Sequence, residues 1–122
     1  MSNKIVKVVQ AQVEAYNAGD IDAFAESYHD NLSLFIFPNE SFCQGKAQLR
    51  EQYSKRFTDR PNAKATIASR VVMGKFVIDD EIVTGIPDAH TLELGTIRAL
   101  AIYEVEGTLI SKAWFIYQPN SN

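Results

Sequence analysis

The chain contains one cysteine, two histidines and no long apolar run. A lone thiol, Cys43, cannot form an internal disulfide, which favours a reducing, cytoplasmic location. No stretch approaches the roughly 18 apolar residues that a membrane-spanning helix needs, and the first residues lack the apolar segment of a signal peptide. The sequence therefore predicts a cytoplasmic protein with no membrane partner.

Strong charge of one sign is also missing. The net charge is −3 over 122 residues, and the lysines and arginines form no basic run. Nucleic-acid binding requires such a run or patch, so we expect no nucleic-acid partner. The histidines, cysteine and carboxylates show no metal-ligand spacing, and no glycine-rich nucleotide motif is present. We therefore expect no metal site and no cofactor.

What the sequence does contain, in its first half, is helical periodicity. Gly19 suits the end of the first helix and Asp20 suits the N-cap of the second, so these two helices meet at a sharp turn. Pro61 marks the end of the third. The predicted helices span residues 4–18, 20–29 and 45–60.

The remaining segments predict strands, because they are rich in β-branched and aromatic residues. Gly74 indicates a bulge, the pair Asp79–Asp80 indicates a hairpin turn, and residues 85–91 read as a loop. The predicted strands span residues 32–37, 63–73, 92–105 and 108–117, and residues 76–83 are predicted to form a short hairpin around the Asp79–Asp80 turn.

This order predicts one α+β domain over residues 1–122. Three N-terminal helices would pack against one face of a curved antiparallel sheet. The two last strands are apolar on both faces, however: Ala99 and Ala101 alternate with Leu100 and Ile102. A second apolar face needs a cover, which predicts a homodimer through the sheet. Singly exposed apolar residues are the ordinary alternative.

Four segments, in their order along the chain, resemble one known superfamily. They are residues 13–24 (VEAYNAGDIDAF), 28–30 (YHD), 45–49 (GKAQL) and 107–114 (GTLISKAW). The chain resembles the SnoaL-like and ketosteroid isomerase-like branch of the nuclear transport factor 2-like superfamily. The resemblance implies a cone-shaped fold around one deep, largely apolar pocket. Such folds host isomerases, cyclases, hydrolases and binding proteins, so function depends on the site.

The resemblance places the isomerase residues at Gln12, Ile36 and Ala99. The isomerases carry a tyrosine acid, an aspartate base and a buried aspartic acid at those places. An isoleucine cannot accept a proton and an alanine cannot donate one. We therefore expect the pocket to lack ketosteroid isomerase activity.

A small, largely apolar molecule is the ligand that this pocket predicts. Gln12 would fix its polar group. The positions of Tyr28 and Tyr53 support the tyrosine acid in some isomerases, so Gln12, Tyr16, Tyr28 and Tyr53 could form a polar string. Aromatic residues at helical spacing are also ordinary core residues. The predicted lining consists of Gln12, Tyr16, Phe35, Phe37, Tyr53, Phe57, Ala99 and Trp114.

Catalytic candidates are weak. His90 lies in a loop that could close the pocket, and Lys112 would be reactive if its ammonium faced an apolar cavity, although its stem could equally lie along the sheet. Cys43 reads as a structural thiol. Three functions stay open: a binding protein, a SnoaL-like enzyme with a non-standard polar set, and a dimerisation module with a filled pocket. A cavity of roughly 300 Å³ or more would favour the first two.

Overall fold

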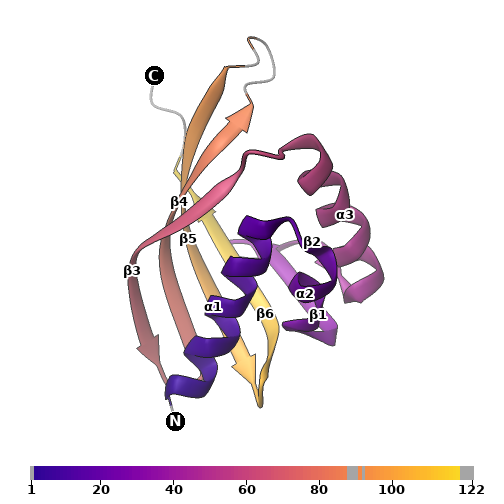
Figure 1. Cartoon of the computed structure of the whole chain (residues 1–122). Coiled ribbons are helices and arrows are strands. Elements are labelled where there is room, and N and C mark those ends of the chain that lie inside the picture. Colours follow the sequence, from indigo (N-terminus) through magenta and orange to yellow (C-terminus); the bar gives the residue numbers. More distant parts are fainter. Residues whose placement is uncertain (1, 88–90, 92, 119–122) are drawn as a thin grey trace.

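The computed structural model describes residues 2–87, 91 and 93–118, with helices packed against one side of a strongly curved sheet (Figure 1). The helices are α1 (Ser2–Ala18), α2 (Ile21–Glu26) and α3 (Gly45–Asp59). The strands are β1 (Tyr28–Ile36), β2 (Glu40–Gln44), β3 (Lys64–Met73), β4 (Phe76–Pro87), β5 (Leu94–Glu106) and β6 (Leu109–Tyr117). No helix in the described ranges is long and apolar enough to cross a membrane.

The six strands form one open sheet in the order β2-β1-β6-β5-β4-β3. All neighbouring pairs are antiparallel except β1 and β6, which run parallel. The predicted α+β class with three helices against a curved sheet is confirmed, and the sheet is mixed. The parallel pair arises because the chain leaves β1 through β2 and α3 and returns to it only at the end, with β6.

The junction of the first two helices follows the sequence closely. Gly19 adopts a φ of +66°, which a residue without a Cβ reaches at little cost, and the Asp20 carboxylate accepts a hydrogen bond from the Ala23 N–H at 3.1 Å. Asn17 fixes the end of α1 to β3, since its side-chain amide exchanges two hydrogen bonds with the backbone of Ala65, at 3.0 and 2.7 Å. The helix pair is therefore anchored at its turn.

Several local predictions were wrong. Residues 85–87, predicted as the start of a loop, belong to β4, and Gly74, predicted as a bulge, is a turn residue. The hairpin turn lies at Gly74 and Lys75, where Gly74 has a φ of +60°, and Asp79 and Asp80 stand in the middle of β4. The second helix ends at Glu26, and β1 already begins at Tyr28. β2 was missed altogether, because its five polar and apolar residues carry no clear period.

The core lies between the helices and the lower half of the sheet. Phe24 of α2 packs against Tyr28 of β1 and Tyr53 of α3, with ring centroids 5.4 and 4.7 Å apart. Leu32, Leu34, Leu49 and Ile110 are fully buried around these rings. Full burial of each such side chain stabilises the fold by about 1.5–3 kcal/mol. The helices thus close one end of the curved sheet and leave the other end free to enclose a cavity.

The sheet has two different faces. On β5, Ala99, Ala101 and Tyr103 are buried on the concave face, and Leu100 and Ile102 are half-buried on the convex face. The convex face also carries Phe35 and Trp114, whose rings stack 5.7 Å apart. The helices cover only the concave face (Figure 1).

A glycine sets the bend of β4. Gly85 has a φ of +75° and lies where the β4–β5 register shifts, between Thr84 and Ile86. A Cβ at this position would collide with the backbone carbonyl of Asn62, in the segment that follows α3. Only glycine allows this close approach, and the bulge turns the end of β4 towards α3.

Candidate functional site

A pocket lies between the concave face of β4–β6 and the helices α1 and α3. Its volume is about 80 Å³, which is smaller than the roughly 300 Å³ expected for a ligand pocket, and it holds several waters or one small molecule. Its lining residues are Gln12, Val13, Tyr16, Phe24, Tyr53, Arg56, Arg60, Ala65, Glu81, Val83, Ile86, Ile97, Ala99, Tyr103, Phe115 and Tyr117.

Half of the predicted lining residues stand at this pocket. Gln12 and Tyr16 reach it from α1, Tyr53 from α3 and Ala99 from β5. The other four residues lie elsewhere. Phe57 borders a smaller cleft beside the end of α3, Phe37 is half-exposed, and Phe35 and Trp114 stack on each other across β1 and β6.

Trp114 was assigned to the wrong face of β6. The residues that point into the pocket are Phe115 and Tyr117, one position further along. Side chains alternate between the two faces of a strand, so an error of one residue exchanges the faces. The same reasoning moves Phe35 out of the pocket, because it pairs with Trp114 in the parallel register.

Gln12 is held by two hydrogen bonds. Its Oε1 accepts from the Tyr28 hydroxyl at 3.1 Å, and its Nε2 donates to the Val9 carbonyl at 3.3 Å. Tyr28 is fully buried, and burial raises its pKa well above the usual value. Of the predicted polar string of Gln12, Tyr16, Tyr28 and Tyr53, only Gln12 and Tyr28 are joined by a side-chain hydrogen bond among the described residues, and Gln12 presents its amide to the pocket.

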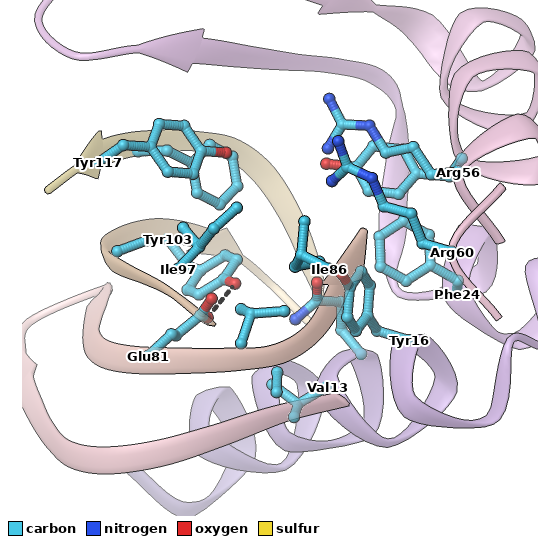
Figure 2. A pocket seen from close by; sticks show the side chains of 16 residues that line it. Val13, Tyr16, Phe24, Arg56, Arg60, Glu81, Ile86, Ile97, Tyr103 and Tyr117 are labelled. Carbon is cyan, nitrogen blue, oxygen red and sulfur yellow. Dashed lines mark hydrogen bonds between the residues drawn. The ribbon is translucent and has the colours of Figure 1, made fainter. Parts of the chain in front are cut away.

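A buried carboxyl group is the main feature that the sequence did not predict. Glu81 lines the pocket with only 8% of its surface exposed, and its Oε2 accepts a hydrogen bond from the Tyr103 hydroxyl at 2.8 Å (Figure 2). Burial raises the pKa of Glu81 to about 7; nearby Asp79 adds to the rise, and Tyr103 and Arg70 oppose it. Both protonation states are therefore accessible near neutral pH.

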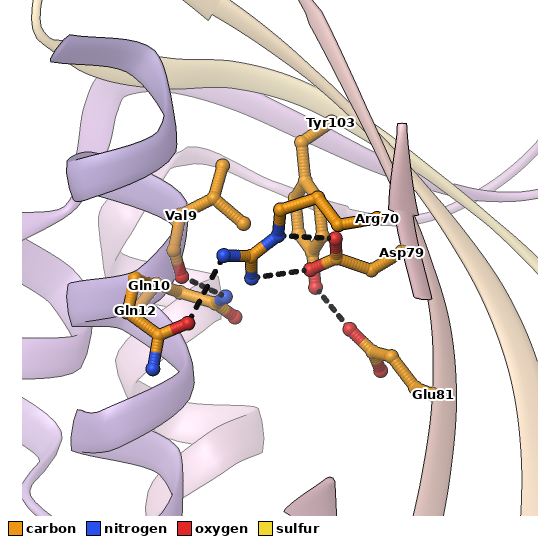
Figure 3. A network of polar contacts seen from close by, with 7 residues as sticks. All are labelled: Val9, Gln10, Gln12, Arg70, Asp79, Glu81 and Tyr103. Atoms are coloured by element: carbon orange, nitrogen blue, oxygen red, sulfur yellow. Dashed lines mark hydrogen bonds and ion pairs between the residues drawn. The ribbon is translucent and has the colours of Figure 1, made fainter. Parts of the chain in front are cut away.

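The next carboxyl on this face of β4 has a different partner. Asp79 is fully buried and forms a bidentate ion pair with Arg70 of β3, at 2.6 and 2.9 Å (Figure 3). The same guanidinium donates to the Gln10 side chain of α1 at 3.1 Å. This network ties α1 to the sheet beside the pocket, and each of the three guanidinium nitrogens of Arg70 donates one hydrogen bond to it.

Two arginines stand on the α3 side of the pocket, opposite Tyr117 (Figure 2). Arg56 lies in the last turn of α3 and Arg60 follows as its C-cap. The Arg56 guanidinium lies over the Tyr53 ring at 4.6 Å, and both arginines are half-buried. Neither has a carboxylate within 4 Å among the residues described here.

The structure gives no support for a catalytic role of the weaker candidates, His90, Lys112 and Cys43. His90 lies outside the described residues. Lys112 is exposed on the convex face and does not line the pocket. Cys43 is buried in β2, and burial raises the pKa of its thiol to about 11, so it is a poor nucleophile. No group of three metal-ligating side chains occurs in the described part of the chain.

Glu81 had a signal in the sequence. In the stretch Val77 to Val83, period-2 alternation places Asp79 and Glu81 on one face with the two valines. The adjacent Asp79–Asp80 pair suggested a turn instead, since aspartate is a common turn residue. Arg56 and Arg60 lie three and seven residues after Tyr53, which is the spacing of one helix face.

Comparisons with known proteins identify the family to which this chain is similar. The model of a family described as a SnoaL-like domain matches residues 9–113. A comparison with curated proteins found no match.

Solved structures show the same fold. One is an uncharacterised cystatin fold protein from Novosphingobium aromaticivorans, with 25% identity, a TM-score of 0.80, and coverage of 92% of this chain and 97% of that one. Another is a putative SnoaL-like polyketide cyclase from Jannaschia, with 13% identity, a TM-score of 0.79, and coverage of 94% and 85%. A third is a protein with a ketosteroid isomerase-like fold from Catenulispora acidiphila, in complex with trimethylamine, with 13% identity, a TM-score of 0.76, and coverage of 88% and 82%.

Proposed function

The chain belongs to the SnoaL-like domain family, and on that premise we propose that it binds a small molecule in the pocket and exchanges a proton with it through Glu81, without ketosteroid isomerase activity. The observation that carries this proposal is a buried carboxyl group that lines the cavity and has a tyrosine hydroxyl as its partner. A general acid or base works best when its pKa lies near the working pH. The pKa of Glu81, about 7, meets that condition.

The surroundings of Glu81 favour a chemical role over a purely structural one. A structural carboxylate in a protein interior is normally neutralised by a cation, as Asp79 is by Arg70. Glu81 has no such direct partner among the described residues and keeps one oxygen, Oε1, without a recorded bond. That oxygen is available to a ligand. Such a group costs stability, and a catalytic role explains why the fold retains it.

The case against isomerase chemistry rests on three positions. Ile36 does not line the pocket, Gln12 presents an amide that is already hydrogen-bonded, and Ala99 has no polar group. Ala99 is the cross-strand partner of Glu81 on β4, so a carboxyl group stands beside the place where the isomerases carry their buried acid. The base at the Ile36 position has no replacement there. A general base contributes about 10²–10⁴-fold, so its loss removes most of that reaction.

Binding without turnover is the second candidate. The described lining residues include no cysteine, serine, histidine or lysine that could form a covalent intermediate. A ligand held by Gln12 and the tyrosines would then use Glu81 only as a hydrogen-bond partner.

Nuclear magnetic resonance separates these candidates. A fragment library is screened against the ¹⁵N-labelled protein, and hits are titrated at pH 5.5 and pH 8.5. We expect shifts at Tyr16, Glu81 and Ala99, with affinities that change with pH in the wild type and not in Glu81→Gln. Glu51→Gln, an exposed glutamate on α3, is the matched control. Hits that lie only outside the pocket would refute the binding proposal, and pH-independent affinity in the wild type would refute the role of Glu81.

Isomerase activity is tested directly with a β,γ-unsaturated ketosteroid. We expect no rate above that of the buffer. Turnover that is abolished by Glu81→Gln would show that Glu81 replaces the missing base and would overturn this part of the proposal.

The convex face supports a further part of the proposal, a homodimer through the sheet. Phe35 and Trp114 stack there, and Ile116, which is 39% exposed, lies two residues after Trp114 on β6. A second copy would bury this apolar surface. Sedimentation should give a dimer at micromolar concentration, and Trp114→Lys should shift it to monomer. A wild-type monomer at that concentration would contradict the proposal.

A further inference from the structure

We infer that the ligand is a small monocarboxylate, with its carboxylate bound by Arg56 and Arg60 at the mouth of the pocket and its apolar body directed towards Glu81. The inference rests on the proposed function in one respect, since it uses the same pocket. It does not require that Glu81 transfers a proton.

The two arginines form a cationic site at one end of the cavity. They are four residues apart at the end of α3, and both line the pocket, with Tyr16 and Tyr53 beside them. Figure 2 shows both guanidinium groups on the same side of the cavity, across from Tyr117 and away from Glu81. Burial raises the pKa of Tyr117, and the charge of Arg56 opposes that rise, so this charge acts across the mouth.

The other arginines of the described chain have acidic partners. Arg50 pairs with Asp22 at 2.7 Å, Arg70 with Asp79 at 2.6 Å, and Arg98 with Asp80 at 2.6 Å. Arg56 and Arg60 differ from them in having none within the described ranges, although both are half-buried. The protein as a whole carries a net charge of −3, so two guanidinium groups with no acidic partner among the described residues are a local exception.

The end of a helix offers an ordinary reason for basic residues, because cations there interact favourably with the helix dipole. That effect does not require the side chains to line a cavity. Lys55, one residue before Arg56, is exposed and pairs with Asp59 at 2.8 Å, as a solvated helix-end cation does. Arg56 and Arg60 point instead into the pocket.

The chemistry of the pocket narrows the anion to a monocarboxylate. The guanidinium fork matches the planar carboxylate and can bind it with two parallel hydrogen bonds. The walls between the arginines and Glu81 are apolar and include Val83, Ile86 and Ile97, so the rest of the ligand is apolar. A second negative charge at the far end would meet the Glu81 carboxylate. A cation at the mouth would meet two guanidinium groups.

Benzoate and benzamide are the probes, since they share a shape and differ in charge. Their affinities are measured by ¹⁵N chemical-shift titration of the full chain at pH 7.5. We expect benzoate to bind at least about tenfold more tightly than benzamide, a difference of about 1.4 kcal/mol. Higher salt should weaken benzoate alone.

Arg60→Gln tests the site because the Arg60 side chain makes no hydrogen bond or ion pair with the residues that the structure describes. Benzoate affinity should fall about five- to tenfold, and benzamide affinity should not change. Arg50→Gln, which removes an arginine from the outer side of the same helix, is the matched control and should leave both affinities unchanged. Equal affinities of the two probes in the wild type, no benzoate binding, or an unchanged benzoate affinity in Arg60→Gln would each overturn the inference.

The variant Glu81→Gln distinguishes a failure of the carboxylate site from a failure of the proposed function. It should retain benzoate binding, or strengthen it, because a nearby negative charge is removed. If benzoate is preferred and its affinity has no dependence on the ionisation of Glu81, the carboxylate site stands and the proton-transfer role fails.

Discussion

Asp79 and Glu81 lie two residues apart on the concave face of β4, and the regions around them differ in one respect. Asp79 faces a guanidinium that also binds Gln10 of α1, so its charge is neutralised and both of its carboxylate oxygens accept hydrogen bonds. Glu81 faces a cavity and, among the described residues, has only the Tyr103 hydroxyl as a direct partner. The same sheet therefore pairs one buried carboxyl with an arginine and leaves the other at the cavity wall.

Asp80, between them, provides an internal reference. It points to the convex side and pairs with Arg98 at 2.6 Å, near solvent. Three successive acidic residues thus have three environments, set by the alternation of the strand. Each prediction below tests one of these environments.

The largest effect is expected from Arg70→Met. This change leaves the fully buried Asp79 charge without its partner, and breaking a buried ion pair costs about 3–5 kcal/mol. Urea unfolding measures the loss in the free energy of unfolding.

The double variant Asp79→Leu/Arg70→Met is the control, since apolar groups of similar size often replace a buried ion pair without loss. It should recover most of the stability. A single variant as stable as the wild type would show that the network does not hold α1 to the sheet.

The second effect concerns Glu81 and pH. Its folded pKa of about 7 lies above the ordinary 4.5, so between these values the folded chain binds more protons than the unfolded chain. The free energy of unfolding therefore falls as the pH rises through this window, by up to about 3 kcal/mol from this group.

Urea midpoints of the wild type and Glu81→Gln between pH 4.5 and 8 measure this contribution. The difference between the two proteins should grow with pH, with the variant the more stable above pH 7. Glu51→Gln should follow the wild type. Parallel profiles for the wild type and Glu81→Gln would mean that the pocket leaves Glu81 well solvated.

A smaller effect is expected from Tyr103→Phe. The hydroxyl donates to the charged form of Glu81, so its loss raises the pKa of that carboxyl further and costs about 1.5 kcal/mol at pH 8. Titration of the Glu81 carboxyl carbon by ¹³C resonance measures the pKa. Phe115 borders the same pocket without a hydroxyl, so Phe115→Leu serves as a packing control and should leave the pKa nearly unchanged. A lower pKa in Tyr103→Phe would contradict the assigned donor.

The smallest effect is expected from Arg98→Met. Its partner Asp80 is near solvent, and exposed pairs contribute little. We expect no change in the urea midpoint beyond the error between wild-type replicates. A loss comparable to that of Arg70→Met would remove the distinction between the two faces of β4.

The sequence predicted the frame of the molecule better than its site. The helices were visible because apolar residues repeat over many turns, and Gln12, Tyr16 and Tyr53 followed from the helical face on which they lie. The prediction that Trp114 lines the pocket was wrong because both faces of β6 are apolar, so periodicity could not say which face meets the helices. Glu81 was not predicted as a pocket residue because the pair Asp79–Asp80 before it suggested a turn. Its role depends on burial by β5 and α1, which no local pattern records.

Gly85 has a consequence for how this pocket can change over time. The contact between its backbone and that of Asn62 joins the arginine-bearing end of α3 to the strand that carries Glu81, and no side chain takes part in it. The separation between the cationic end and the acidic end of the cavity is thus a property of the main chain. Substitutions in the wall, at Val83 or Ile97 for example, can change the shape of the cavity without moving the arginines or Glu81. The main chain therefore sets the distance between the two charged ends, and the side chains between them are free to vary.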